Sequence, residues 1–151
     1  TLEGLGHGIA DEHGARLVGH GQIRTRGPLG RHHREGLSAK MKVAHLGINA
    51  ANAENAAQIA ELFHVLFGFE PKYGNSSIFV GDKMIEIVKE NGRGTNGHIC
   101  IAVDDMAKAM DELKEKGVAF DESSAKYKNG ELTAIYFKDE IAGFAIHLLK
   151  N

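Results

Sequence analysis

The feature that most constrains the fold is a short pattern that occurs twice between residues 41 and 151. The stretch "AHLGI" at residues 44–48 places a histidine inside an apolar run, and "GHICI" at residues 97–101 does so again. A segment with helical spacing follows each run, and shorter apolar runs complete each half. Two copies of one order of elements predict a domain built from two similar modules.

The first half is expected to form a strand, a helix and two more strands. Asn52 can cap the start of the helix, and Gly68 can end it in the left-handed conformation. The pair Gly81-Asp82 has the composition of a tight hairpin turn between the last two strands. The expected strands are residues 42–50, 76–81 and 83–89, and the expected helix is residues 52–67.

The second half repeats this order. Asp104 or Asp105 can cap a helix that Gly117 stops. The glycine-rich residues 91–97 do not follow the strand-loop-helix pattern of a phosphate site, so they are interpreted as the linker between the modules. The expected strands are residues 97–103, 120–130, 132–139 and 143–150.

Residues 1–40 differ in composition from the rest of the chain. They hold nine of the nineteen glycines and five of the nine histidines, and they show no sustained period of 2 or 3.6. We expect a leader or linker of unclear origin outside the core. A histidine-rich metal tract is disfavoured because the spacing matches no ligand pattern. The expected domain is 41–151, with modules 41–92 and 96–151.

Charge and apolar content exclude several classes of protein. A formal net charge of -2 gives no reason to expect binding to nucleic acid or to an anionic membrane. No apolar run approaches the roughly 20 residues that span a bilayer. A single cysteine excludes an internal disulfide framework and fits a reducing compartment. The expectation is a soluble, cytoplasmic protein whose partner is a small molecule.

Strand parity singles out four polar side chains. Successive residues of a strand point to opposite faces, so each of these side chains lies opposite aliphatic residues that are expected to face a helix. For any one histidine alone, a satisfied or solvent-facing strand residue is the favoured interpretation. Three imidazoles and a carboxylate on one inner face are unfavourable unless they are paired or bind a cation, so together they favour a site. The four residues are His45, Glu86, His98 and His147.

The donor types limit the choice of metal. Histidine nitrogens with one carboxylate suit zinc, nickel, iron(II), manganese or cobalt, and an open coordination position would serve catalysis. Cys100 lies two residues beyond His98 on the same strand face. A soft ligand or a reactive thiol is one interpretation of this cysteine, but a small buried side chain is favoured.

These residues resemble the vicinal oxygen chelate family, also called the glyoxalase/bleomycin-resistance/dioxygenase superfamily. The resemblance covers residues 41–151 and rests on "AHLGI", "MIEIV", "GHICI" and "GFAIHLL". It implies an α+β fold in which two βαβββ modules form a cupped mixed sheet with helices on the convex side. Position by position, it also places the family's metal ligands at His45, Glu86, His98 and His147.

Within this family, the chain resembles the glyoxalase-like domain at the carboxyl end of some bacterial 2-keto-3-deoxyphosphogluconate/4-hydroxy-2-oxoglutarate aldolases. The aldolase barrel has no room in 151 residues, so no Schiff-base lysine is carried over. The lactoylglutathione lyase branch of the family commonly has a glutamate at the last ligand position, where this chain has His147. This departure argues against that particular reaction, although imidazole can both ligate a metal and move a proton near neutral pH.

Two hypotheses for the function follow. The first is a metal-dependent enzyme of the lyase or isomerase type, acting on a small substrate with adjacent oxygens such as a 2-oxo or hydroxy-keto compound. Glu86 or His147 would move the proton. The second is a non-catalytic module of the same fold that binds a small molecule or regulates a partner domain. Convergence of the four side chains to within a few ångströms of one point favours the enzyme, and separations beyond about 7 Å favour the binding module.

A homodimer is also expected. Two small modules leave sheet edges to protect, and in the family pairs of chains often cover each other's cups.

Overall fold

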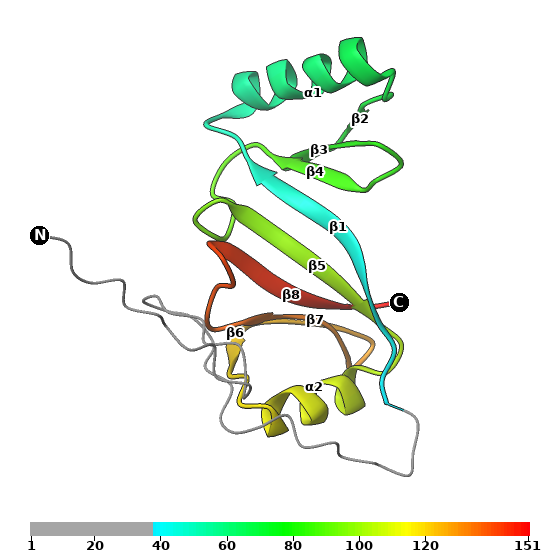
Figure 1. Cartoon of the computed structure of the whole chain (residues 1–151), viewed down its shortest axis with the longest axis vertical. Helices are drawn as coiled ribbons and strands as arrows, with labels where there is room; N and C mark the ends of the chain where they lie inside the picture. Colours follow the sequence, from blue (N-terminus) through cyan, green and yellow to red (C-terminus); the bar gives the residue numbers. More distant parts are fainter. Residues whose placement is uncertain (1–37) are drawn as a thin grey trace, which may run out of the picture.

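The computed structural model describes residues 38–151, which form two modules with the same order of elements (Figure 1). Residues 1–37 of the expected leader lie outside the described residues. The first module contains β1 (Met41–Asn49), α1 (Ala53–Phe67), β2 (Lys72–Tyr73), β3 (Ser77–Val80) and β4 (Ile85–Val88). The second contains β5 (Gly97–Val103), α2 (Met106–Glu115), β6 (Phe120–Lys128), β7 (Glu131–Phe137) and β8 (Phe144–Lys150).

All eight strands belong to one mixed sheet with the order β2-β3-β4-β1-β5-β8-β7-β6. Within each module the first and last strands are parallel, β1 with β4 and β5 with β8. The modules join through the antiparallel pair β1 and β5 at the centre of the sheet. Figure 1 shows α1 and α2 at opposite ends of this sheet. The α+β fold of two βαβββ modules forming a cupped sheet is therefore confirmed.

The helices begin where the capping residues predict. The Asn52 side chain accepts a hydrogen bond from the Asn55 amide at 2.7 Å, and Asp105, rather than Asp104, accepts one from the Lys108 amide at 3.0 Å. Gly68 ends α1 with a φ of 73°, the left-handed conformation that glycine adopts without steric cost. The two-residue strand β2 was not predicted, because a strand this short has no period to detect.

Each module has a hydrophobic core of its own, formed between its helix and the outer face of the sheet. In the first, Ala56 and Ala60 of α1 are fully buried against strand residues. The buried members of this core are Ala56, Ala60, Ile78, Val80 and Ile87. Those of the second are Val103, Met106, Ala109, Met110, Phe120, Ile135 and Leu148. Ile87, Val103 and Leu148 have the opposite parity to Glu86, His98 and His147 on their strands, so the cores lie on the opposite face from these three residues.

The outer face of β1 departs from the expected pattern. We expected Leu46 and Ile48 to face a helix, but Leu46 remains 36% exposed. The helix α1 packs on β3 and β4 instead. Among residues 38–151, no helix is long and apolar enough to cross a membrane.

Candidate metal centre

The inner face of the sheet carries two adjacent rows of side chains, each running across several strands. In one row, Gly47 of β1 pairs with Glu86 of β4 on one side and with His98 of β5 on the other. In the next row, His45, Cys100, His147 and Tyr136 are paired in turn across β1, β5, β8 and β7. Paired residues on neighbouring strands point to the same face, so both rows line the cup.

A bulge in β1 places His45 in the cup. Val43 pairs with Ile101, whereas His45 pairs with Cys100, so Ala44 is an extra residue on β1. In a regular strand, residues two apart share one face. Because of the extra residue, Val43 is paired with Ile101 and points outward, whereas His45 is paired with Cys100 and points into the cup.

Three donor atoms converge in this cup. Glu86 Oε2 lies 3.0 Å from His45 Nε2 and 3.2 Å from His98 Nε2, and the two imidazole nitrogens are 3.1 Å apart. For metal bonds of about 2.1 Å, neighbouring ligand atoms are about 3.0 Å apart in an octahedral arrangement and about 3.4 Å apart in a tetrahedral one. The observed triangle lies between these values, so the three side chains could hold a divalent metal ion.

The protonation of this cluster suits a cation. Hydrogen bonds from His45 and then from His98 hold the pKa of Glu86 well below its usual range, and they outweigh the opposing effect of burial. Glu86 is therefore ionised near neutral pH. A neutral imidazole has one N–H and one lone pair, so each histidine can turn a lone pair toward a bound ion.

Gly47 provides the space in which the donors meet. It sits between Glu86 and His98 in the first row, and a β-carbon at this position would overlap the Cε1 and Nδ1 atoms of His98. Gly47 is itself buried. The imidazole of His98, 4% exposed as a whole residue, thus lies directly over the backbone of β1.

His147 lies beside this triangle rather than in it. Its ring centroid is 5.9 Å from that of His45 and 5.5 Å from that of His98. Its Nε2 is buried with no hydrogen-bond partner among residues 38–151. Burial, followed by the neighbouring charges of His98 and His45, lowers the pKa of His147 to about 4. The imidazole is therefore neutral near pH 7 and has a lone pair available.

An aromatic stack supports His147. The ring of Tyr136 lies parallel to the imidazole at 4.7 Å between centroids, and the guanidinium of Arg93 lies over the Tyr136 ring at 4.4 Å. Arg93 also donates a hydrogen bond of 3.1 Å to Asp121. No sequence pattern singled out Arg93, because it lies in a segment interpreted only as a linker.

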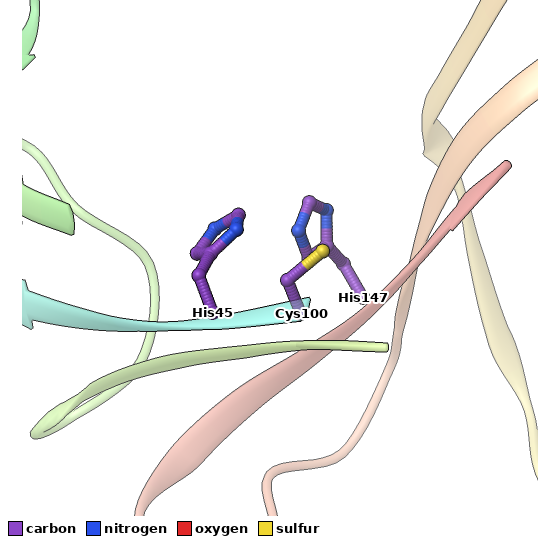
Figure 2. A group of neighbouring side chains, drawn as sticks. All are labelled: His45, Cys100 and His147. Carbon is purple, nitrogen blue, oxygen red and sulfur yellow. The ribbon is translucent and has the colours of Figure 1, made fainter. Parts of the chain in front are cut away.

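Cys100 lies between His45 and His147, and its side chain is fully buried. Burial, and to a lesser degree the charge of Glu86, raises the pKa of its thiol to about 12. Figure 2 shows the three side chains rising from neighbouring strands on the same side of the sheet. Their donor atoms lie within 4.8 Å of one another and form a second group that could hold a metal ion.

A cavity of about 450 Å³ adjoins the cup behind Phe79. The Phe79 ring lines this cavity and also meets the His45 ring edge-on at 5.9 Å between centroids. The cavity is lined by Gly68, Phe69, Glu70, Lys72, Phe79, Gly81, Asp82 and Lys83.

Solved structures share this architecture. A methylmalonyl-CoA epimerase is 15% identical with a TM-score of 0.50, and the alignment covers 72% of this chain and 93% of the epimerase. A hypothetical protein from Bacillus halodurans C-125 is 14% identical with a TM-score of 0.51, over 74% of this chain and 95% of that one. At such identities the likeness concerns the fold alone. No curated protein matches the chain significantly.

The family assignment rests on the sequence as well as on the fold. The family model described as Glyoxalase/Bleomycin resistance protein/Dioxygenase superfamily matches residues 9–148, which is most of the chain. The two βαβββ modules and the polar cup between them agree with this match. The chain belongs to the glyoxalase/bleomycin resistance protein/dioxygenase superfamily.

Proposed function

We propose that the cup is the active site of a metal-dependent enzyme of the lyase or isomerase type. Its substrate would be a small molecule with two adjacent oxygens, such as a 2-oxo or hydroxy-keto compound. The observation that carries the proposal is the triangle of donor atoms from His45, Glu86 and His98, with edges of 3.0–3.2 Å. Zinc, nickel, iron, manganese and cobalt all suit two imidazoles and one carboxylate.

His45, Glu86 and His98 would hold the ion. When bound, a divalent cation would act as a Lewis acid that stabilises negative charge on the substrate oxygens. The carboxylate of Glu86 would lower the net charge of the site from +2 to +1.

Of the two predicted proton carriers, Glu86 and His147, the contacts favour His147. Glu86 is engaged by both histidines of the triangle, which leaves it as a ligand. His147 is neutral near pH 7 and has a buried nitrogen without a partner among residues 38–151. It would take a proton from a substrate carbon and return it, which is general acid–base catalysis by an imidazole. His147 completes the predicted set as this base or as a fourth ligand.

The geometry supports an enzyme over a non-catalytic binding module. A module that only sequesters a ligand tolerates separated polar groups, and separations beyond about 7 Å would have favoured it. The donor atoms of His45, Glu86 and His98 are less than half that distance apart.

The cytoplasmic location and the homodimer remain predictions. Light scattering at high micromolar concentration would measure the oligomeric state.

Metal analysis is the first test. We expect the metal-stripped protein to bind one equivalent of a divalent transition metal, and Glu86→Gln to lower the affinity by about tenfold or more. Glu70→Gln is the matched control, because the Glu70 side chain is 84% exposed and forms an ion pair with His64 rather than with a residue of the triangle. Less than a tenth of an equivalent bound, with no binding on titration, would remove the proposed mechanism.

Proton exchange tests the chemistry. The metal-loaded protein should exchange carbon-bound hydrogen of 2-oxo and hydroxy-keto compounds with deuterated water, as followed by NMR. The metal-stripped protein and His147→Gln should exchange it at least tenfold more slowly. Equal rates with and without metal would contradict a role for the metal ion.

A further inference from the structure

The cup contains a donor group that the proposed reaction does not use. Cys100 is the only cysteine of the chain, and it lies in the row His45, Cys100, His147 across three adjacent strands. In this row the thiol has an imidazole on each side, as Figure 2 shows. The donor atoms of the three residues all lie within 4.8 Å of one another.

We propose that His45, Cys100 and His147 form a second metal site, overlapping the first, that selects a thiophilic ion such as Cu⁺ or Cd²⁺. Two imidazole nitrogens and one sulfur make a softer donor set than the two nitrogens and one carboxylate oxygen of the first site. Bonds of about 2.0 Å to nitrogen and about 2.3 Å to sulfur place neighbouring ligand atoms roughly 3.3–3.8 Å apart, so side-chain rotation would have to close any larger separation.

A second observation points to the same place. Nε2 of His147 is buried and has no hydrogen-bond partner among residues 38–151. A buried polar atom without a partner is unfavourable, so it calls for an explanation, and a bound ion is one. His147 is outside the triangle of His45, Glu86 and His98, and an ion bound in the second site would engage it directly.

Binding of the ion releases one proton, from the thiol of Cys100. The Sγ–H bond of Cys100 breaks, an Sγ–metal bond forms, and the proton leaves to solvent. The imidazoles of His45 and His147 each donate a lone pair and neither gains nor loses a proton. No oxidant or reductant takes part, because the ion keeps its charge.

The two sites exclude each other because both use His45. A neutral imidazole offers one lone pair, so His45 can serve one ion at a time. A thiophilic ion in the second site would therefore displace a harder ion such as Mn²⁺ from His45, Glu86 and His98. This competition rests on the proposed function, whereas the existence of the second site does not.

Cadmium titration of the full chain tests the second site. We expect a thiolate-to-cadmium charge-transfer band in the ultraviolet that saturates at one equivalent. The histidines among residues 1–40 contribute no sulfur, so this band reports Cys100 alone. Cys100→Ser should abolish it, and His147→Gln should weaken cadmium binding at least tenfold. Glu86→Gln is the matched control and should keep the band, because Glu86 belongs only to the first site.

A measurement on the unaltered protein covers the case in which Cys100→Ser fails to fold. The ¹¹³Cd NMR resonance should lie in the downfield range of sulfur-containing sites rather than in that of nitrogen and oxygen ligands alone. Absence of both the band and this resonance would overturn the second site. It would leave the first site untouched.

Manganese release tests the competition. In the protein loaded with Mn²⁺, one equivalent of Cd²⁺ should release the manganese, which is detected by its free-ion EPR signal. A sulfur signal without manganese release would show two ions bound together and would overturn the sharing of His45. A sulfur signal in a protein that never binds Mn²⁺ would support the second site while counting against the first.

Discussion

Gly47 and His98 are paired across β1 and β5, and the imidazole of His98 occupies the volume that a β-carbon at residue 47 would fill. The donor triangle depends on this relationship. Glu86 and His98 stand on either side of Gly47 in one row of the sheet, and their side chains meet above it with that of His45. A residue without a side chain is therefore as necessary to the site as its ligands.

Gly47→Ala should disrupt the site without changing the fold class. The new methyl group would displace the His98 ring and lengthen its distances to Glu86 and His45. We expect metal affinity to fall by about tenfold or more, measured by competition with a chromophoric chelator. We also expect overpacking to lower the free energy of unfolding by about 1–3 kcal/mol.

The effect of Gly47→Ala on stability can be assigned to His98 by a double-mutant cycle. In the His98→Ala background the ring is gone, so adding Gly47→Ala should destabilise the protein much less than it does in the wild type. Equal destabilisation in the two backgrounds would place the clash elsewhere. Denaturant unfolding of the metal-free proteins measures all four free energies.

The role of His147 in metal binding is tested by two substitutions. His147→Ala should reduce the affinity for a divalent metal by about tenfold or more, and His147→Glu should bind better than the alanine variant because it restores a ligand. The alanine variant also loses the stacking contact with Tyr136, so some loss of apo stability is expected. Unchanged metal binding with a strongly destabilised apo fold would make His147 a structural residue.

The burial of His147 also predicts a pH dependence of stability. Its pKa is about 4 in the folded protein, against 6.5 for an exposed imidazole. Between these values the unfolded chain binds more protons, so the free energy of unfolding rises with pH from about 4 to about 6.5 and then levels off. In the metal-free protein this rise should be on the order of 3 kcal/mol.

His147→Gln provides the comparison for this pH dependence. Glutamine does not titrate in this range, so the rise between about pH 4 and 6.5 should be smaller in the variant by the amount that His147 contributes. Chemical denaturation at a series of pH values measures both curves. Parallel curves would mean that His147 is not held neutral by burial.

Tyr136 should control the pKa of His147 through their stacked rings. Tyr136→Ala admits water to one face of the imidazole, so the pKa of His147 should rise from about 4 toward 6.5. Tyr136→Phe keeps the ring and should leave that pKa nearly unchanged. Tyr127→Ala is a suitable control, since Tyr127 is 64% exposed at the edge of the sheet. An NMR titration of the His147 imidazole signals would distinguish these variants.

Most of the fold could be predicted from local patterns. The repeated order of strand, helix and meander could be predicted from the spacing of apolar residues. The helix starts could be predicted because the side chains of Asn52 and Asp105 each accept a hydrogen bond from a backbone amide three residues later. Alternation alone also assigned His45, Glu86, His98 and His147 to the face opposite their aliphatic neighbours, because successive residues of a strand point to opposite faces. These features depend on neighbours along the chain, so the sequence contains them directly.

The arrangement of the site depended on contacts between strands that are distant in the sequence. Parity could not reveal the bulge at Ala44 that turns His45 inward relative to Val43, because a bulge exists only in the pairing of β1 with β5. The pairing of β1 with both β4 and β5 likewise placed Gly47 between Glu86 and His98. The sequence determined which residue types face the cup. The register between the strands decided which of them meet, because donor atoms come within 3.2 Å only when backbones from both modules are aligned across the sheet.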